Sequence, residues 1–142
     1  MTIVDTNILI YDTFKDTAHH KEARKLLDSL PKWNIPSIVL IEFIAFLNRI
    51  RLGRSDMLSK LNELANNPKF NLVEIEKEDL LEALKTVGEE KISTLRLNDK
   101  IILSIAKRLG EDLATFDKKL REESKRGNVA IAIDSSFKDV AT

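Results

Sequence analysis

The chain has 142 residues, of which 43% are hydrophobic and 32% charged, the composition of one globular domain expected over 1–142, and no apolar run approaches the roughly 18 residues of a membrane span. Its 23 Lys and Arg balance 23 Asp and Glu, which excludes the strongly basic class of nucleic-acid-binding domains and leaves only local patches for RNA. The absence of cysteine excludes disulfides and thiolate metal sites, so any metal must be bound by oxygen or imidazole.

The first half of the chain predicts two strands and three helices. A strand over 2–5 begins without the basic segment and apolar core of a signal peptide, so we expect a cytoplasmic protein. The strand breaks at Asp5, Thr6 and Asn7, residue types that favour turns and helix N-caps. A helix over 18–30, a short strand over 33–35, a strongly apolar helix over 37–52 and a helix over 55–66 follow.

The second half continues the alternation. Its pattern predicts a strand over 70–75, a helix over 78–87 closed by Gly88, a helix over 98–109, a strand over 113–116, a helix over 118–126 and a last strand over 129–133. Strands that alternate with helices usually pair in parallel through crossover connections. The expected fold is therefore α/β, a three-layer α/β/α sandwich with a mainly parallel central sheet.

Four acidic residues stand at the ends of apolar runs: Asp5, Glu42, Asp99 and Asp117. Carboxylates are rarely buried unless they are paired or bound to metal, so acids beside core-forming segments predict a compensating cation. Mg²⁺ or Mn²⁺ would suit oxygen ligands. Asp5 and Asp117 follow the carboxyl ends of predicted strands, where ligands bind in open α/β sheets.

Each acid also has a purely structural interpretation. Asp5 and Asp117 could be turn residues or helix N-caps, and Asp99 could complement the dipole at the start of its helix. Glu42 has apolar neighbours at helical spacings, so its carboxylate could reach out of a largely buried helix or pair with Arg49. These alternatives stay open for each acid taken alone.

Four segments together resemble a known family. Residues 3–9, 37–42, 97–106 and 115–117 resemble the motifs of the PIN-domain nucleases, in order and across nearly the whole chain. Among the compact single-domain members of that family, the chain is most similar to the VapC toxins of prokaryotic toxin–antitoxin pairs.

The resemblance implies an endoribonuclease that depends on Mg²⁺ or Mn²⁺ and hydrolyses RNA phosphodiester bonds. It implies catalytic and metal-binding roles for Asp5, Glu42, Asp99 and Asp117, with Asn7 and Thr115 as polar support. Carboxylate-held divalent ions can activate water and stabilise charge on the phosphoryl and leaving oxygens. A cognate antitoxin is the partner that the resemblance suggests.

The chain departs from its relatives after Asp117, where Lys118 and Lys119 stand in place of the further acidic or amide residue that many carry. The choice between one and two metal ions therefore stays open. Candidate RNA contacts are Arg49, Arg51, Lys118 and Lys119, although a solvated helix face explains most such residues taken singly. The helix over 37–52 is hydrophobic nearly all round, more than one core-facing stripe requires, and we expect a homodimer.

Two rival functions belong to other classes. A catalytically degenerate PIN-like module that binds RNA or protein is the stronger rival, since a fold alone does not establish catalysis. A phosphotransferase of the haloacid dehalogenase kind also begins with an aspartate after its first strand. It normally carries a second aspartate two residues on, where this chain has Asn7, which counts against it.

Overall fold

The computed structural model describes residues 1–132, apart from the side chain of Leu95. In chain order the elements are β1 (Thr2–Val4), α1 (Thr6–Thr13), α2 (His20–Ser29), β2 (Trp33–Pro36), α3 (Ser37–Arg49), α4 (Arg54–Ala65), β3 (Phe70–Val73), α5 (Lys77–Glu90), the 3₁₀ turn η1 (Thr94–Arg96), α6 (Leu97–Leu109), β4 (Asp112–Ala114) and α7 (Lys118–Arg126). Over these described residues, none of the helices has the length and apolar character needed to cross a membrane.

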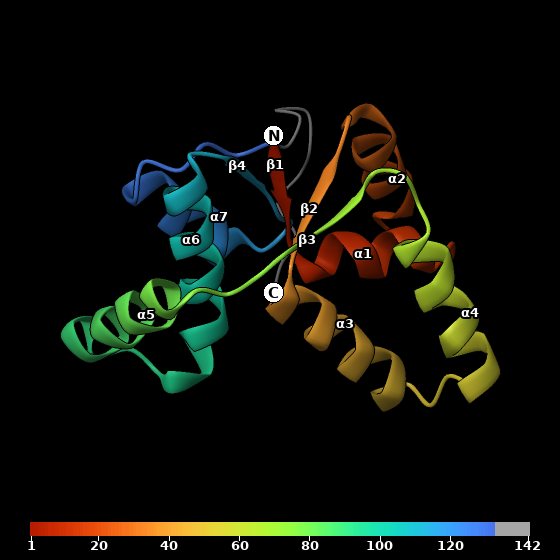
Figure 1. Cartoon of the computed structure of the whole chain (residues 1–142), viewed down its shortest axis with the longest axis horizontal. Coiled ribbons are helices and arrows are strands. Elements are labelled where there is room, and N and C mark those ends of the chain that lie inside the picture. The colour runs from red at the N-terminus through yellow and green to blue at the C-terminus, as the bar shows by residue number, and fades with distance from the viewer. Residues whose placement is uncertain (133–142) are drawn as a thin grey trace.

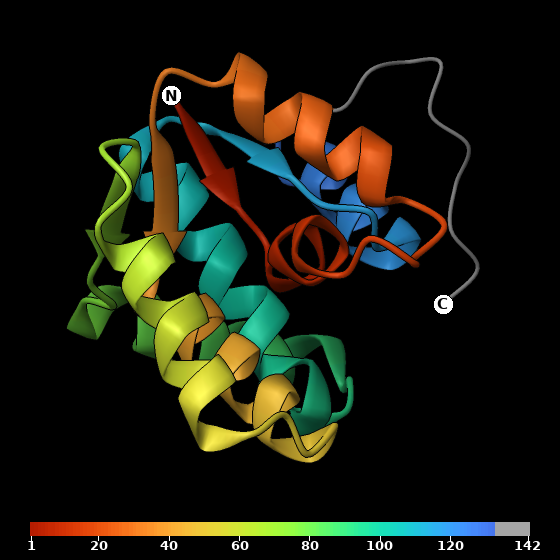
Figure 2. The same ribbon diagram turned by 90° about the vertical axis from the view of Figure 1, so that its right-hand side faces the viewer.

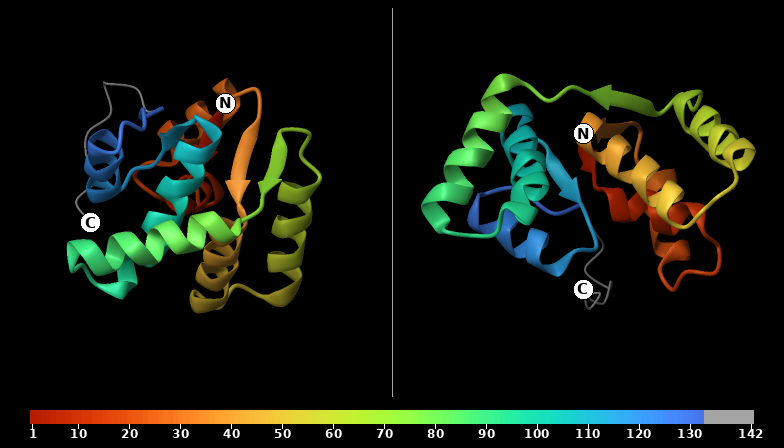
Figure 3. Two further views of the ribbon diagram at one scale, coloured as in Figure 1. Left: turned by 60° about the vertical axis from the view of Figure 1, so that its left-hand side comes forward. Right: turned by 90° about the horizontal axis from the view of Figure 1, so that it is seen from below.

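The four strands form one parallel sheet in the order β3-β2-β1-β4. Ile3 in β1 is paired with Asn34 in β2 on one side and with Leu113 in β4 on the other. Figure 2 shows β1 between these two neighbours, and the left panel of Figure 3 shows β2 and β3 side by side in the same direction. The chain moves outward from β1 to β3 and then returns to the opposite side of β1, so the strand order reverses between β1 and β4.

Helices cover both faces of the sheet. Figure 1 shows α1 to α4 on one side of the strands and α5 to α7 on the other. This arrangement confirms the α/β class and the three layers expected from the sequence, and the sheet is parallel throughout. The central strand β1 and its neighbour β2 are buried along their whole length, as expected for a parallel sheet covered on both faces, whereas the edge strand β3 is only partly buried.

The core lies between the sheet and the two helical layers. Ile3, Ile35 and Leu113 of the strands are fully buried. Fully buried side chains from the helices on the two sides include Leu27, Phe43, Leu47, Ile102, Ile105 and Leu120. The sheet is thereby fixed between rigid layers, and the ends of its strands become well-defined positions for polar side chains.

Helix α1 was not expected from the sequence. Asp5 has extended backbone angles and its carboxylate accepts a hydrogen bond from the amide of Thr6, which makes it the N-cap of α1. Ile8 and Leu9 of this helix are buried. The helix is short and contains β-branched residues, so tertiary packing on the sheet decides its conformation rather than intrinsic propensity.

Several boundaries also differ from expectation; for example, α3 ends at Arg49 and β3 at Val73, before the expected residues 52 and 75. Helix α5 runs through the exposed Gly88 to Glu90, and it ends instead at Lys91, which has a positive φ of 53°. Strand β4 ends at Ala114, two residues earlier than expected. The strand expected over 129–133 is wrong in its described part, where a single bridge joins Leu113 to Ile131, and residue 133 lies outside the described residues.

Candidate metal centre

The reversal of strand order places Asp5 and Thr115 side by side. Asp5 directly follows β1, and its amide donates to the carbonyl of Ala114 at 3.0 Å, which extends the pairing of β1 with β4 by one residue. Its side chain is buried, and the hydroxyl of Thr115 donates to Asp5 Oδ2 at 2.6 Å. The first acid of the sequence motif therefore lies at the switch point, where open α/β sheets bind ligands.

Asn7 joins the two sides of this switch point. Its Nδ2 lies 3.2 Å from Thr115 Oγ1 and 3.4 Å from Asp5 Oδ2, and its Oδ1 accepts from the amide of Phe116 at 3.2 Å. Thr115 Oγ1 also accepts from the amide of Asp117 at 3.1 Å. Asn7 and Thr115 thus orient Asp5 and the backbone that leads to Asp117, and this geometry agrees with a supporting role.

Glu42 projects from α3 and meets two polar residues that sequence reasoning missed. Its Oε1 accepts from the hydroxyl of Thr6 at 2.8 Å, and its Oε2 accepts from Asn98 Nδ2 at 3.2 Å. No ion pair joins it to Arg49 within the part of the chain that the structure describes. Their positions in the sequence could have indicated both donors, because Thr6 directly follows Asp5 and Asn98 directly precedes Asp99.

Asp99 lies in the first turn of α6 with a half-buried side chain, 3.5 Å from the guanidinium of Arg96. Burial is the largest effect on the Asp99 carboxyl, and together with the charges of Asp117, Glu123 and Glu42 it raises the pKa to about 6 against the opposing charge of Arg96. These electrostatic contributions connect Asp99 with two other acids of the predicted site.

Asp117 is the N-cap of α7. Its Oδ1 accepts from the amides of Lys119 at 2.9 Å and Leu120 at 3.3 Å. The structural interpretation of Asp117 is therefore correct, as it is for Asp5. Capping through one carboxylate oxygen is compatible with a ligand role, because a carboxylate offers about four lone-pair positions.

The family model of the PIN domain matches residues 2–125. The chain belongs to the PIN-domain family. This membership removes the haloacid dehalogenase alternative. A comparison with curated protein sequences found no match.

Solved structures with the same fold include a toxin and a toxin–antitoxin complex. VapC20 of Mycobacterium tuberculosis, a toxin that cleaves the sarcin–ricin loop, aligns with a TM-score of 0.74 at 18% identity over 87% of this chain and 95% of its own. VapBC2 of Rickettsia felis, bound to a DNA fragment of its promoter, gives a TM-score of 0.66 at 24% identity, over 92% of this chain and 96% of its own. FitAcB of Neisseria gonorrhoeae gives a TM-score of 0.69 at 16% identity, again over 92% of this chain and 96% of its own. The α/β fold of this PIN domain is the fold of VapC toxins.

Two of the four acids, Asp5 and Asp99, have pKa values that are raised mainly by burial and also by the charges of neighbouring acids. Burial raises the pKa of Asp5 to about 7 against the opposing hydrogen bonds from Thr115 and Thr6, and the charges of Asp99 and Glu42 add to the rise. An acid cluster at a switch point is short of positive charge, and its oxygen-only ligands match Mg²⁺ or Mn²⁺ in kind. The donor set therefore fits a divalent cation.

The four carboxylates are not arranged around a common point that could hold an ion. Within the described residues, no group of three or more His, Asp or Glu side chains converges closely enough to hold an ion. Glu42 is engaged by Thr6 and Asn98, and Asp117 by the first turn of α7. Binding a cation would therefore require at least some of these carboxylates to move closer together.

The basic residues predicted to contact RNA separate into two places. Lys118 and Lys119 are exposed in the first turn of α7, directly after Asp117. Arg49 is exposed in the last turn of α3, seven residues and about 10 Å of helix from Glu42. Arg51 follows with a positive φ of 59° in the turn before α4. The structure thus brings Lys118 and Lys119, but not the arginines, to the end of the sheet that carries the acids.

Proposed function

We propose that this PIN domain is an endoribonuclease that depends on Mg²⁺ or Mn²⁺. The observation that carries the proposal is the buried Asp5, whose pKa rises to about 7 beside Glu42 and Asp99 at the switch point of the sheet. A buried, repelling acid cluster is costly to the folded protein unless a cation neutralises it. Family membership supports phosphodiester hydrolysis as the chemistry for such a cluster.

Asp5, Glu42, Asp99 and Asp117 would hold the metal and act in catalysis. A bound divalent ion would lower the pKa of a water and neutralise charge on the phosphoryl and leaving oxygens. The other groups of the chain position these ligands. Thr115 and Asn7 orient Asp5, while Thr6 and Asn98 direct the two oxygens of Glu42. Four carboxylates suffice to hold one ion.

RNA is the proposed substrate, and an antitoxin is the proposed partner. The likeness to VapC20, a toxin that cleaves the sarcin–ricin loop, and to a toxin–antitoxin complex from Klebsiella pneumoniae supports both. Lys118 and Lys119 supply local positive charge for a phosphate strand although the whole chain is neutral. Arg49 and Arg51 are proposed as more distant contacts along the same strand.

We also propose a homodimer, because apolar side chains stay exposed on two helices. Ile41 of α3 is 59% exposed, and Leu80, Leu81 and Leu84 of α5 are between 42% and 55% exposed. Neighbouring exposed leucines on one helix are typical of a surface that another chain covers. A second copy of this chain is the occupant we propose.

One observation favours a catalytically degenerate binding module as the second candidate, namely the lack of a converged ion cage among the described residues. The two functions separate in one experiment. Mn²⁺ is titrated against the metal-free protein while thermal unfolding is followed, and RNA cleavage is assayed with Mn²⁺ or Mg²⁺ and then with excess EDTA. The nuclease requires a higher melting temperature with Mn²⁺ and cleavage that EDTA abolishes. A degenerate module would show neither effect.

A further inference from the structure

A second group of charges lies next to Asp99. Arg96, the last residue of η1, contacts the carboxylate of Asp99 at 3.5 Å and also that of Glu123 from α7. The side chain of Glu123 is only 7% exposed, so its negative charge requires partners. Lys100 supplies the other one, with Nζ 3.0 Å from Glu123 Oε2. Glu123 therefore shares its two oxygens between a cation of η1 and a cation of α6.

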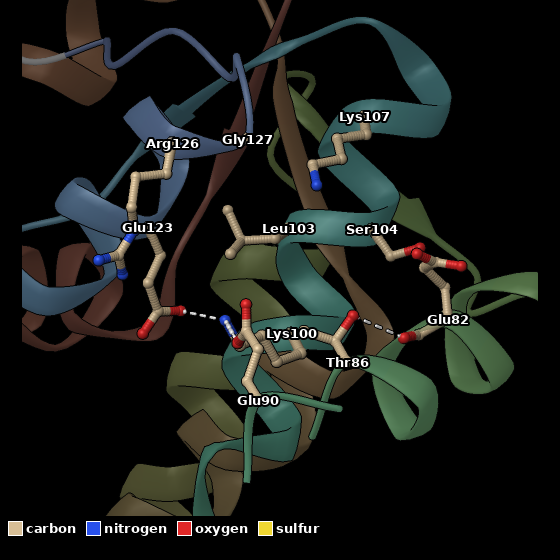
Figure 4. A pocket seen from close by; sticks show the side chains of 10 residues that line it. All are labelled: Glu82, Thr86, Glu90, Lys100, Leu103, Ser104, Lys107, Glu123, Arg126 and Gly127. Carbon is tan, nitrogen blue, oxygen red and sulfur yellow. Dashed lines mark hydrogen bonds and ion pairs between the residues drawn. The ribbon is translucent and has the colours of Figure 1, made fainter. Parts of the chain in front are cut away.

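This network joins three helices. Figure 4 shows Lys100 between Glu123 of α7 and Glu90 of α5, and its Nζ lies 3.1 Å from Glu90 Oε2. The side chain of Lys100 is 8% exposed, which shields the pair with Glu123 from water. Removing one partner of such a buried pair leaves an uncompensated charge, so the geometry of Glu123 is strongly constrained.

We propose that Arg96 and Glu123 form an ionic clamp that positions Asp99 in the metal centre. The inference rests on the proposed function, since it assigns the clamp to that centre. Arg96 provides the one ion pair that Asp99 forms among the described residues. Glu123 belongs to the helix that Asp117 caps, so the clamp also ties the start of α6 to α7 and sets the separation of Asp99 from Asp117.

Glu123 has a second effect in this arrangement. A guanidinium beside a metal ligand competes with the cation for that carboxylate, because both are positive. The same Nη2 atom of Arg96 contacts both Glu123 and Asp99, so the guanidinium is shared between two carboxylates and Glu123 offsets part of its charge. The clamp thus fixes Asp99 and still leaves its carboxylate available to a metal. Arg96 and Glu123 are positioning residues and are not expected to contact the reacting atoms.

The first test uses metal-free protein and needs no activity. Urea unfolding midpoints are measured for Arg96→Gln, Asp99→Asn and the double variant, and the same cycle is repeated in a Glu123→Gln background. If the clamp exists, the effects of the Arg96 and Asp99 substitutions on stability should not be additive. The coupling energy between these two residues should also change when Glu123 is neutralised. Additive effects in both backgrounds overturn the proposal. Should Glu123→Gln fail to fold, the cycle in the wild-type background decides.

The second test measures Mn²⁺ binding by calorimetry and RNA cleavage by kcat and KM. Glu123→Gln should weaken Mn²⁺ binding and lower kcat by about 10–100-fold, as expected for outer partners of metal ligands, with KM little changed. Arg96→Lys should retain most of both properties. The control is Arg24→Gln, which likewise removes an arginine with two carboxylate partners, Asp12 and Asp28, and should leave both properties unchanged.

The outcomes separate the two proposals. Loss of stability in Glu123→Gln with unchanged Mn²⁺ binding would mean that the network is merely structural and would overturn the clamp. Wild-type protein that neither binds Mn²⁺ nor cleaves RNA would instead overturn the ribonuclease proposal, and the metal-free cycle would still decide whether Arg96 and Glu123 position Asp99.

Discussion

The hydroxyl of Thr115 donates to Asp5 Oδ2 at 2.6 Å although 110 residues separate the two in the sequence. This bond joins the ends of β1 and β4 at the point where the strand order reverses. It favours the charged form of Asp5, yet burial outweighs it and raises the pKa of the carboxyl to about 7. The same contact therefore belongs to the packing of the sheet and to the proposed metal centre.

Asp5→Asn should abolish RNA cleavage that depends on Mn²⁺ and leave the metal-free protein at least as stable as wild type. The change removes a proposed ligand together with a charge that is costly to bury. Because the raised pKa means that the folded state binds the proton more tightly, wild-type stability should fall as pH rises from 3.8 to about 7 and then level off. In wild type this loss of stability corresponds to at most about 4 kcal/mol, and the variant should not show it.

Urea unfolding in EDTA at pH 5 and pH 8 measures this difference. Asp28→Asn is the control, because the Asp28 side chain is 61% exposed and contacts none of the four acids. If Asp5→Asn and wild type lose the same stability between the two pH values, the buried charge of Asp5 is wrongly assigned.

Sequence reasoning could find the acids but not how they are held. Asp5 and Asp117 stand at strand ends, and Glu42 is an acid among apolar neighbours, so local pattern was enough. The partners of Glu42 come from α1 and α6, and only the folded chain brings Thr6 and Asn98 together. No periodicity in the sequence records such long-range pairs.

The fold was predictable for a similar reason and failed where local signals are weak. Alternating strands and helices predicted the parallel sheet, whereas α1 is a short helix fixed by packing of Ile8 and Leu9. Glycine often marks the end of a helix, but here α5 continues through Gly88, since an exposed glycine inside a helix lowers stability by only about 1 kcal/mol relative to alanine.

Mn²⁺ binding should release protons near neutral pH. The pKa values of about 7 for Asp5 and about 6 for Asp99 mean that both carboxyls are partly protonated at pH 6.5, and a metal requires their ionised forms. Calorimetry at pH 6.5 in two buffers of different ionisation enthalpy should give different apparent enthalpies, and the difference should vanish near pH 8.5. Binding without this buffer dependence would contradict the assignment of both acids as ligands.

Glu42→Gln should remove most of the cleavage with little change in stability. The amide preserves the shape of the side chain and one acceptor for Thr6 or Asn98, so we expect a loss of at most about 1 kcal/mol. Glu63→Gln on α4 is the matched control, because Glu63 is 71% exposed and pairs only loosely with Lys60. Normal turnover by Glu42→Gln would eliminate Glu42 from the metal centre.

Asp79→Ala should destabilise the protein without affecting the chemistry. The fully buried Asp79 accepts hydrogen bonds from Arg108, Ser104 and the amide of Glu76, where it forms a capping box at the start of α5. We expect a loss of about 2–4 kcal/mol from the broken ion pair and cap. Urea unfolding measures this loss, and cleavage per folded molecule should equal that of wild type.

The same residue predicts a pH effect. Contacts with Arg108 and neighbouring donors hold the pKa of Asp79 below its usual 3.8 despite burial. Its contribution to stability is therefore complete above about pH 4 and is lost as acid protonates it. The free energy of unfolding of Asp79→Asn should therefore come closer to that of wild type below pH 4. A difference in stability that stays constant down to pH 2 would contradict the ion pair.

Leu81→Lys should convert the proposed homodimer to a monomer. Leu81 is 55% exposed on α5 beside Leu80 and Leu84, so a charge there opposes burial against a second copy. Light scattering across a concentration series should give the dimer mass for wild type and half of it for the variant. A wild-type monomer at high concentration would remove the dimer proposal.

The order β3-β2-β1-β4 also has a consequence during synthesis. A nascent chain that has emerged as far as β3 can pair β1 with β2, but the other edge of β1 stays open until residues 112–114 leave the ribosome. Asp5 acquires its partner Thr115 at the same moment, and Asp117 follows two residues later. A translation product that stops before residue 115 lacks both Asp117 and the partner of Asp5, so the proposed metal centre cannot form until these residues have left the ribosome.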